Sequence, residues 1–66
     1  MDMILVWSSA ISEVGYDPQS MRMTILFTSG GMYTYCRVPQ HVYDGLMAAP
    51  SKGTYFDHHI RDRYHC

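Results

Sequence analysis

Two tyrosines and one arginine, each two positions apart, are the side chains in this sequence best suited to binding a ligand. Tyr33, Tyr35 and Arg37 alternate with small or apolar residues over 32–38, and this period of two predicts a β-strand with all three side chains on one side. Rings about 7 Å apart on a strand suit two bases, or a base and a ribose, and the arginine beyond them suits a phosphate. The spacing therefore predicts a site for RNA or a small nucleotide, with core packing as the alternative use of the rings.

The carboxyl-terminal segment 57–66 concentrates titratable side chains. If a helix runs through it, three pairs lie one turn apart: Asp57 and Arg61, His58 and Asp62, and His59 and Arg63. One interpretation is a solvated face, on which each ion pair contributes about 0.3–0.5 kcal/mol. The other is a phosphate site in which Arg61 or Arg63 makes two hydrogen bonds to the anion and His59 donates beside it. The candidate nucleotide-binding residues are Tyr33, Tyr35, Arg37, His59, Arg61 and Arg63.

Patterns for metal binding and catalysis are weaker. A zinc site would need His58, His59, His65 and Cys66, but adjacent histidines diverge by about 100° on a helix and the spacing matches no closed tetrahedral site. If the protein were an enzyme, His59, His65 or Tyr64 would supply acid–base chemistry on a phosphodiester. No phosphate-binding glycine loop and no Ser-His-Asp order is present. We therefore expect no metal, no cofactor and no catalytic residue.

The strand that carries the tyrosines is expected to be the last of an antiparallel meander. Segments 10–16 and 21–28 also favour strands, and turns rich in Pro, Asp, Ser and Gly separate the three segments. Two apolar residues of the first segment lie three apart, so this strand needs a bulge, which we expect at Gly15. The apolar run 3–7 is expected to pair at a sheet edge or to contact a second subunit.

After Pro39 the apolar period changes from two to three and four. This period predicts one helix over 40–49 and a second that begins after Ser51 and continues to Tyr64. The expected fold is α+β: a three- to four-stranded antiparallel β-meander followed by two short helices packed on one face. The whole chain, 1–66, forms one domain in this prediction.

Size and charge favour self-association and exclude some partners. The 66 residues are 47% hydrophobic and 14% aromatic, and a core this small is marginal without a partner chain. The net charge of −1 and the pI near 6.4 provide no general basic field, which argues against double-stranded DNA as a partner. We therefore expect a homo-oligomer.

The apolar runs and the cysteines indicate a location inside the cell. The longest apolar run, Met3–Trp7, is far shorter than the ~20 residues that cross a bilayer, and no signal peptide is recognisable. Cys36 and Cys66 do not make a disulfide framework, and we expect a buried free thiol and a loose terminal one. The expected location is the cytoplasm, with no membrane partner.

Several short motifs follow one another in a specific order: Ser8-Ser9-x-Ile11, Val14-Gly15-Tyr16-Asp17, Tyr33-x-Tyr35, Val38-Pro39, Ser51-x-Gly53-x-Tyr55-Phe56 and Ile60-Arg61. From about Val6 to Tyr64 the chain therefore resembles the KTSC family. That family is named after the C-terminal ends of some lysyl-tRNA synthetases and also occurs as small free-standing bacterial and phage proteins. The resemblance implies RNA binding. The chain departs from the family at Asp57, where asparagine is common, and adds His58, His65 and Cys66.

Together these observations predict a small non-enzymatic module that binds RNA or a nucleotide as a homo-oligomer. A near-neutral protein of this size neutralises few phosphates, which favours a compact nucleotide over a long RNA. A phage protein that sequesters a host signalling nucleotide in the bacterial cytoplasm is one example. The alternatives are a protein–protein interaction module that uses Trp7 and the tyrosine face, and a small metal-independent phosphodiesterase acting on cyclic nucleotides.

Overall fold

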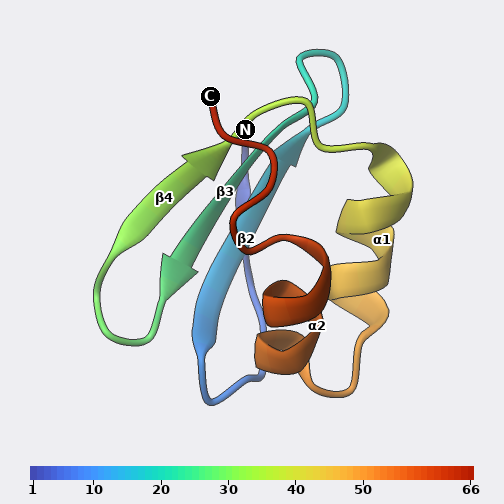
Figure 1. Cartoon of the computed structure of the whole chain (residues 1–66). Helices are drawn as coiled ribbons and strands as arrows, with labels where there is room; N and C mark the ends of the chain where they lie inside the picture. The colour runs from blue at the N-terminus through green and yellow to red at the C-terminus, as the bar shows by residue number, and fades with distance from the viewer.

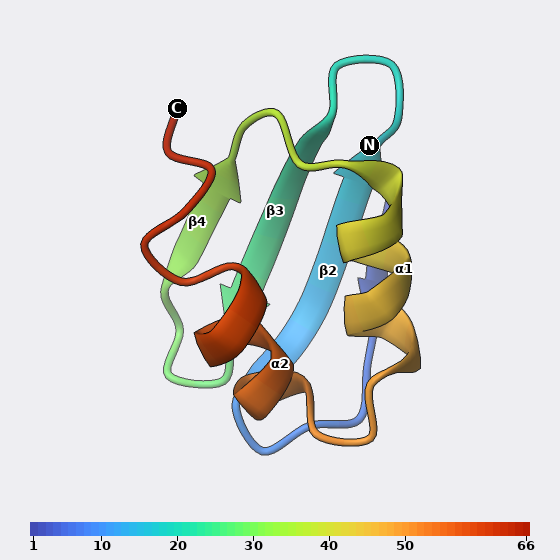
Figure 2. The same ribbon diagram turned by 45° about the vertical axis from the view of Figure 1, so that its right-hand side comes forward.

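Four strands form one antiparallel sheet in chain order, β1-β2-β3-β4, in the computed structural model, which describes residues 1–66 (Figure 1). The elements are β1 (Met3–Leu5), β2 (Ile11–Asp17), β3 (Arg22–Phe27), β4 (Met32–Tyr35), α1 (Gln40–Ala48) and α2 (Lys52–His59). Both helices lie on the same face of the sheet (Figure 2). The α+β prediction, a meander followed by two helices on one face, is confirmed.

An irregularity in β2 sets which side chains reach the core. The register of β2 against β3 shifts between Ile11 and Glu13, so Ser12 is the extra residue of a bulge. The bulge brings Ile11 and Val14, three apart, to the helix-facing side, where both are fully buried. The predicted bulge therefore exists, but its expected place at Gly15 is wrong. A Cβ on Gly15 would come within 2.6 Å of the Met3 sulfur of β1, so this glycine makes room for the Met3 side chain over β2.

The core lies between the sheet and the two helices. Its buried side chains are Ile11, Val14, Met23, Ile25, Val38, Val42, Leu46 and Ile60. Burying one such side chain contributes roughly 1.5–3 kcal/mol to folding. The Tyr16 hydroxyl donates a hydrogen bond to the Val38 carbonyl at 2.6 Å, and the Tyr16 ring stacks on Tyr43 at 4.7 Å. These two contacts fix the start of α1 against β2.

The two helices pack closely because one residue of α1 has no side chain. A Cβ on Gly45 would overlap the Tyr55 hydroxyl of α2. The Lys52 ammonium donates hydrogen bonds to the carbonyls of Met47 and Ala49, at 2.9 and 3.0 Å. Because those carbonyls have no partner within α1, the lysine acts as its carboxyl-terminal cap.

The carboxyl-terminal segment differs from the prediction. α2 ends at His59, with Ile60 as its carboxyl-terminal cap, and does not continue to Tyr64. Asp62 and Tyr64, further along, adopt left-handed backbone angles that no α-helix contains, with φ of 60° and 58°. The chain then returns to β4, where the Cys36 amide donates to the Tyr64 carbonyl at 2.8 Å. We call residues 60–66 the tail. It lies beside the end of β4 in both views (Figures 1 and 2).

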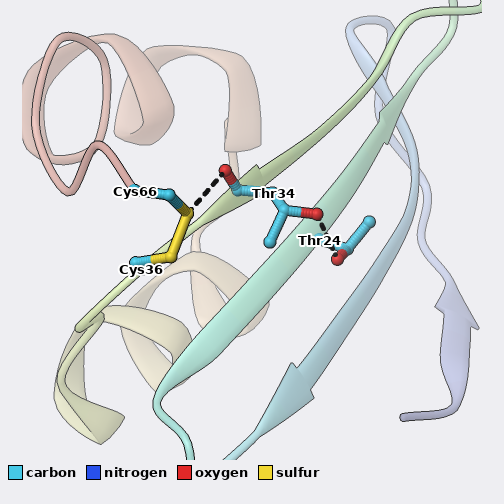
Figure 3. The surroundings of a disulfide bond; sticks show 4 residues. All are labelled: Thr24, Thr34, Cys36 and Cys66. Atoms are coloured by element: carbon cyan, nitrogen blue, oxygen red, sulfur yellow. Dashed lines mark hydrogen bonds between the residues drawn. A yellow bond between two sulfur atoms is a disulfide. The ribbon is translucent and has the colours of Figure 1, made fainter.

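A disulfide joins Cys36 to Cys66, with a Cα–Cα distance of 4.9 Å (Figure 3). The expectation of two free thiols is therefore wrong. The two left-handed residues of the tail reverse the chain direction after α2 and bring the terminal cysteine onto the end of β4. The Cys66 sulfur also lies 3.5 Å from the Thr34 carbonyl oxygen, a contact rather than a hydrogen bond, since a disulfide sulfur carries no proton.

Neither helix has both the length and the apolar character that crossing a membrane requires. α1 and α2 contain 9 and 8 residues, against the ~20 that span a bilayer.

Candidate functional site

The tyrosines of β4 share one side of the strand, and it is the side that faces the helices. Tyr33 pairs with Ile25 and Tyr35 with Met23 in the β3–β4 register. Both partners are fully buried under the helices, and paired residues point to the same face of a sheet. The rings therefore do not stand on the open face of the sheet.

The two rings nevertheless differ in exposure. Tyr33 is 59% exposed: its ring meets that of Phe27 in a T-shaped arrangement, with ring centroids 5.8 Å apart, and also lies over Gly31. Tyr35 is half-buried and packs edge-to-face on Phe56 of α2, also at 5.8 Å. Burial, and to a smaller extent the neighbouring Tyr33, raises the pKa of Tyr35 above its ordinary value. Tyr35 is thus part of the packing between sheet and helix, and Tyr33 is the ring available to a ligand.

Arg37 is exposed but does not continue the strand alternation. The strand ends at Tyr35, and Arg37 adopts a left-handed φ of 56°. The neighbours on either side are both fixed, Cys36 by the disulfide and Val38 by burial. The expected alternation through 32–38 therefore stops before Arg37, and the guanidinium projects from a tight bend at the end of β4.

The tail carries two more exposed arginines, Arg61 and Arg63. The Arg61 guanidinium lies 3.6 Å from the Asp57 carboxylate, an exposed pair one helical turn apart as predicted. The other two predicted pairs are wrong, because α2 ends before Asp62 and Arg63 could complete a helical turn with His58 and His59. The Cys36–Tyr64 hydrogen bond and the disulfide instead bring the segment that carries both arginines to the end of β4.

His59 has its contacts on another side of α2. Its ring lies 4.4 Å from that of Tyr55, and Tyr55 covers Gly45 of α1. The contacts of Tyr33 and Tyr35 are with Phe27 and Phe56 instead. The hydrogen bond and the disulfide at Cys36 therefore place the arginine-bearing segments at the Tyr35 end of β4, whereas Tyr33 contacts Phe27 and Gly31 near the β3–β4 turn. The ring contacts of His59 are with neither tyrosine of β4.

The residues considered for catalysis or metal binding do not form a cluster. Tyr64 is half-buried, and His59 and His65 are exposed. No three His, Cys, Asp or Glu side chains are placed to share a metal ion. Cys66 is committed to the disulfide and has no thiolate to offer as a ligand.

A polar hollow of about 310 Å³ lies where the amino-terminal end of α2 meets the β1–β2 loop. Its lining consists of Ser8, Ser9, Pro50, Ser51, Lys52, Gly53, Thr54 and Asp57. Sequence reasoning did not predict this hollow, although two of the motifs behind the family resemblance, Ser8-Ser9 and Ser51-x-Gly53, meet in it.

Several residues of the polar hollow have structural roles of their own. The Ser8 hydroxyl accepts hydrogen bonds from the amides of Ala10 and Ile11, at 3.1 and 3.3 Å. A Cβ on Gly53 would lie 3.1 Å from that of Ala10, so the glycine permits close packing of α2 on the loop. Lys52 caps α1. These contacts account for Ser8, Lys52 and Gly53 without a ligand.

Comparisons with known proteins agree on one family. Residues 7–64 match the KTSC domain. A protein from Tsukamurella paurometabola is 41% identical over 59 residues, which cover 89% of this chain and 88% of that protein. The crystal structure of a KTSC domain protein from Yersinia pestis superposes with a TM-score of 0.92 at 36% identity, covering 96% of this chain and 89% of that one.

The same domain occurs within much longer proteins. A lysine–tRNA ligase from Nostoc punctiforme is 38% identical over 56 residues, which are 85% of this chain but only 10% of the ligase. The chain thus spans about a tenth of the length of such ligases, and most of their sequence has no counterpart here. With the match over residues 7–64 and the shared fold, the chain belongs to the KTSC domain family.

Proposed function

We propose that this KTSC domain is a non-enzymatic module that binds single-stranded RNA or a small nucleotide at the end of β4. The supporting observation is that the tail is fastened to the strand that carries the exposed Tyr33. The Cys36–Tyr64 hydrogen bond and the disulfide hold it there. We call Tyr33, Arg37, Arg61 and Arg63 the β4–tail face.

The chemistry of this face suits a nucleotide. The half-exposed ring of Tyr33 offers a flat surface for a base, and stacking on an aromatic ring contributes about 1–3 kcal/mol per base. Three exposed guanidinium groups lie on the segments that meet at Cys36, and guanidinium groups bind phosphate through paired hydrogen bonds. The Arg61 guanidinium is already paired with the Asp57 carboxylate, so Arg37 and Arg63 are the principal phosphate ligands in this proposal.

The size of the ligand follows from the small number of cations. Few phosphates can be neutralised by three arginines in a protein of net charge −1. The face therefore holds a compact nucleotide or a short single strand more readily than a long polymer. A nucleic acid ligand is also consistent with the occurrence of similar segments in proteins named lysine–tRNA ligase.

Fluorescence anisotropy tests the proposal with two labelled probes, a short single-stranded RNA and a cyclic dinucleotide, at low and moderate salt. Tyr33→Ala is expected to weaken binding by about 5- to 100-fold, and Tyr33→Phe to preserve it, because the stacking ring remains. Arg63→Gln is expected to weaken binding and to make it less sensitive to salt. Arg22→Gln is the matched control, since Arg22 precedes the buried Met23 in β3 and so lies on the opposite face of the sheet.

Two results would contradict the proposal. Equal binding by the wild type and Tyr33→Ala would mean that the ligand binds elsewhere. Gly53→Val, which fills space beside the polar hollow, would then test whether the ligand binds there. Cleavage of the dinucleotide, followed by chromatography and lost in His59→Ala, would make the protein an enzyme. If only one of the two probes binds, that result identifies whether the β4–tail face accepts single-stranded RNA or a small nucleotide.

A further inference from the structure

The two edges of the sheet differ in how far other segments of the chain cover them. On the β4 edge, the tail covers the end near Cys36, where the Cys36 amide is bonded to the Tyr64 carbonyl and the Thr34 carbonyl is in contact with Cys66. On the other edge, β1 pairs only with β2. An open strand edge without charge, proline or cover is a template for pairing with another chain. β1, Met3–Leu5, contains neither a charge nor a proline.

The hydrogen-bonding direction of β1 defines which groups are free. The Val6 amide donates to the Ser12 carbonyl at 3.0 Å, so Val6 faces β2. Alternate residues of a strand point their backbone groups to the same side, so Ile4 also faces β2. The backbone amides and carbonyls of Met3 and Leu5 therefore point outward, one on either side of Ile4.

The side chains around this edge are apolar and unusually exposed. Trp7 is 98% exposed, Leu5 77%, Met1 58% and Ile4 47%. A shallow hollow of about 270 Å³ beside them is lined by Leu5, Val6, Trp7 and Ser12. Trp7 alone offers on the order of 250 Å², and the four exposed side chains together offer on the order of 600 Å² per copy. If all of this area were covered, two copies would bury at most about 1,200 Å², which is the lower end of stable protein interfaces.

We propose that two copies of this chain pair through β1 as an antiparallel, two-fold symmetric dimer centred on Ile4. In this register Met3 of each copy faces Leu5 of the other, and each of these pairs exchanges both of its backbone hydrogen bonds. Ile4 meets its symmetry mate as a non-hydrogen-bonded pair, the closer of the two kinds of pair. Trp7 lies opposite Met1 of the other copy and shares a face of the joined sheet with Met3 and Leu5.

A second copy fits this edge because apolar side chains face one another in this register, Met3 with Leu5 and Met1 with Trp7. Its two outward-facing residues are equidistant from Ile4, as a two-fold axis requires. The only charged residue over 1–7 is Asp2, and in this register the two Asp2 side chains lie about 13 Å apart along the strands, beyond the Debye length in physiological salt. The dimer uses the edge opposite the β4–tail face, so it leaves that face open and does not depend on nucleotide binding.

Sedimentation velocity and tryptophan fluorescence test the dimer on the intact, oxidised protein. The expected mass is twice the 7.6 kDa of one chain. Trp7 is the single tryptophan, so its emission reports the interface directly and is expected to shift to the blue as protein concentration rises. Leu5→Lys is expected to raise the dissociation constant on the order of 100-fold, because it places a charge in the strand pairing. Since Leu5 is mostly exposed, the variant keeps the monomer fold.

Met32→Lys is the matched control. Met32 is 59% exposed and lies in β4, on the edge away from β1, so this variant is expected to dimerise normally. A wild-type protein that sediments as a monomer at all concentrations, with unshifted tryptophan emission, would overturn the proposal, as would a dimer that Met32→Lys breaks and Leu5→Lys does not. Monomeric Leu5→Lys is expected to bind the nucleotide probes as the wild type does, so the dimer and the nucleotide site succeed or fail separately.

Discussion

Removing the Cys36–Cys66 disulfide is expected to remove a large part of the stability of this small domain. The two cysteines are 30 residues apart in sequence, and the entropy of closing a loop of that length in the unfolded chain corresponds to about 3.6 kcal/mol at 25 °C. A domain of this size has few core side chains with which to compensate. Cys36→Ala/Cys66→Ala should therefore lower the free energy of unfolding by about 3–4 kcal/mol.

Urea denaturation followed by circular dichroism measures this loss. With an m-value of about 1 kcal/mol/M, the unfolding midpoint should fall by about 3–4 M. Reductant should destabilise the wild type by a similar amount and leave the double alanine variant unchanged, which is the internal control. Hydrogen exchange adds a local measurement: the Cys36 amide, bonded to the Tyr64 carbonyl, should lose protection when the tail is released. A variant within about 0.5 kcal/mol of the wild type would refute the reasoning.

Three further predictions concern packing and pH. Gly45→Ala should destabilise the protein by about 1–2 kcal/mol despite the better helix propensity of alanine, because the new Cβ overlaps the Tyr55 hydroxyl. In a Tyr55→Ala background the same change should stabilise the protein. Thermal unfolding of the wild type, both single variants and the double variant measures the two effects. Tyr16→Phe should cost about 1 kcal/mol through loss of the 2.6 Å hydrogen bond to the Val38 carbonyl, measured in urea. Burial raises the pKa of Tyr35, so the neutral side chain stabilises the fold fully below pH ~10, the unfolded pKa, and this contribution is lost as pH rises through the folded pKa. Tyr35→Phe should therefore reduce the loss of stability at alkaline pH, and an unchanged alkaline profile would contradict the prediction.

Local patterns predicted the fold well because the meander is built from local signals. Alternating strands, turns rich in glycine and proline, and the change of period after Pro39 each depend on neighbours in sequence. The position of the bulge was not predictable in this way. Gly15 is permissive, but the register shift falls at Ser12, and Gly15 instead makes room for the side chains of Met1 and Met3.

The tail shows where sequence reasoning stops. Residues 57–66 have a helical spacing of charges, yet α2 ends at His59 because the tail gains its partners at β4 instead. The disulfide depends on the same return of the chain, since 30 residues separate its cysteines. A long-range contact of this kind leaves no local pattern, and it overrides the helical preference of the segment.

The candidate site was predictable only in part for a related reason. Alternation placed Tyr33 and Tyr35 on one side of a strand, as observed, but could not say that this side faces the helices. The difference in exposure between the rings depends on Phe56 of α2, which covers only Tyr35. The roles of Tyr33 and the arginines in binding stay predictions.

The disulfide that holds the tail on the end of β4 also bears on the proposed assembly. In the proposed dimer β1 pairs with its own copy, and a two-fold contact of this kind closes after two chains. Reduction would release the tail from the end of β4. A contact between β1 of one copy and β4 of the next would be head-to-tail, so chains would keep adding without closing into a pair. If the dimer forms as proposed, the Cys36–Cys66 bond therefore favours a closed pair over an open-ended filament.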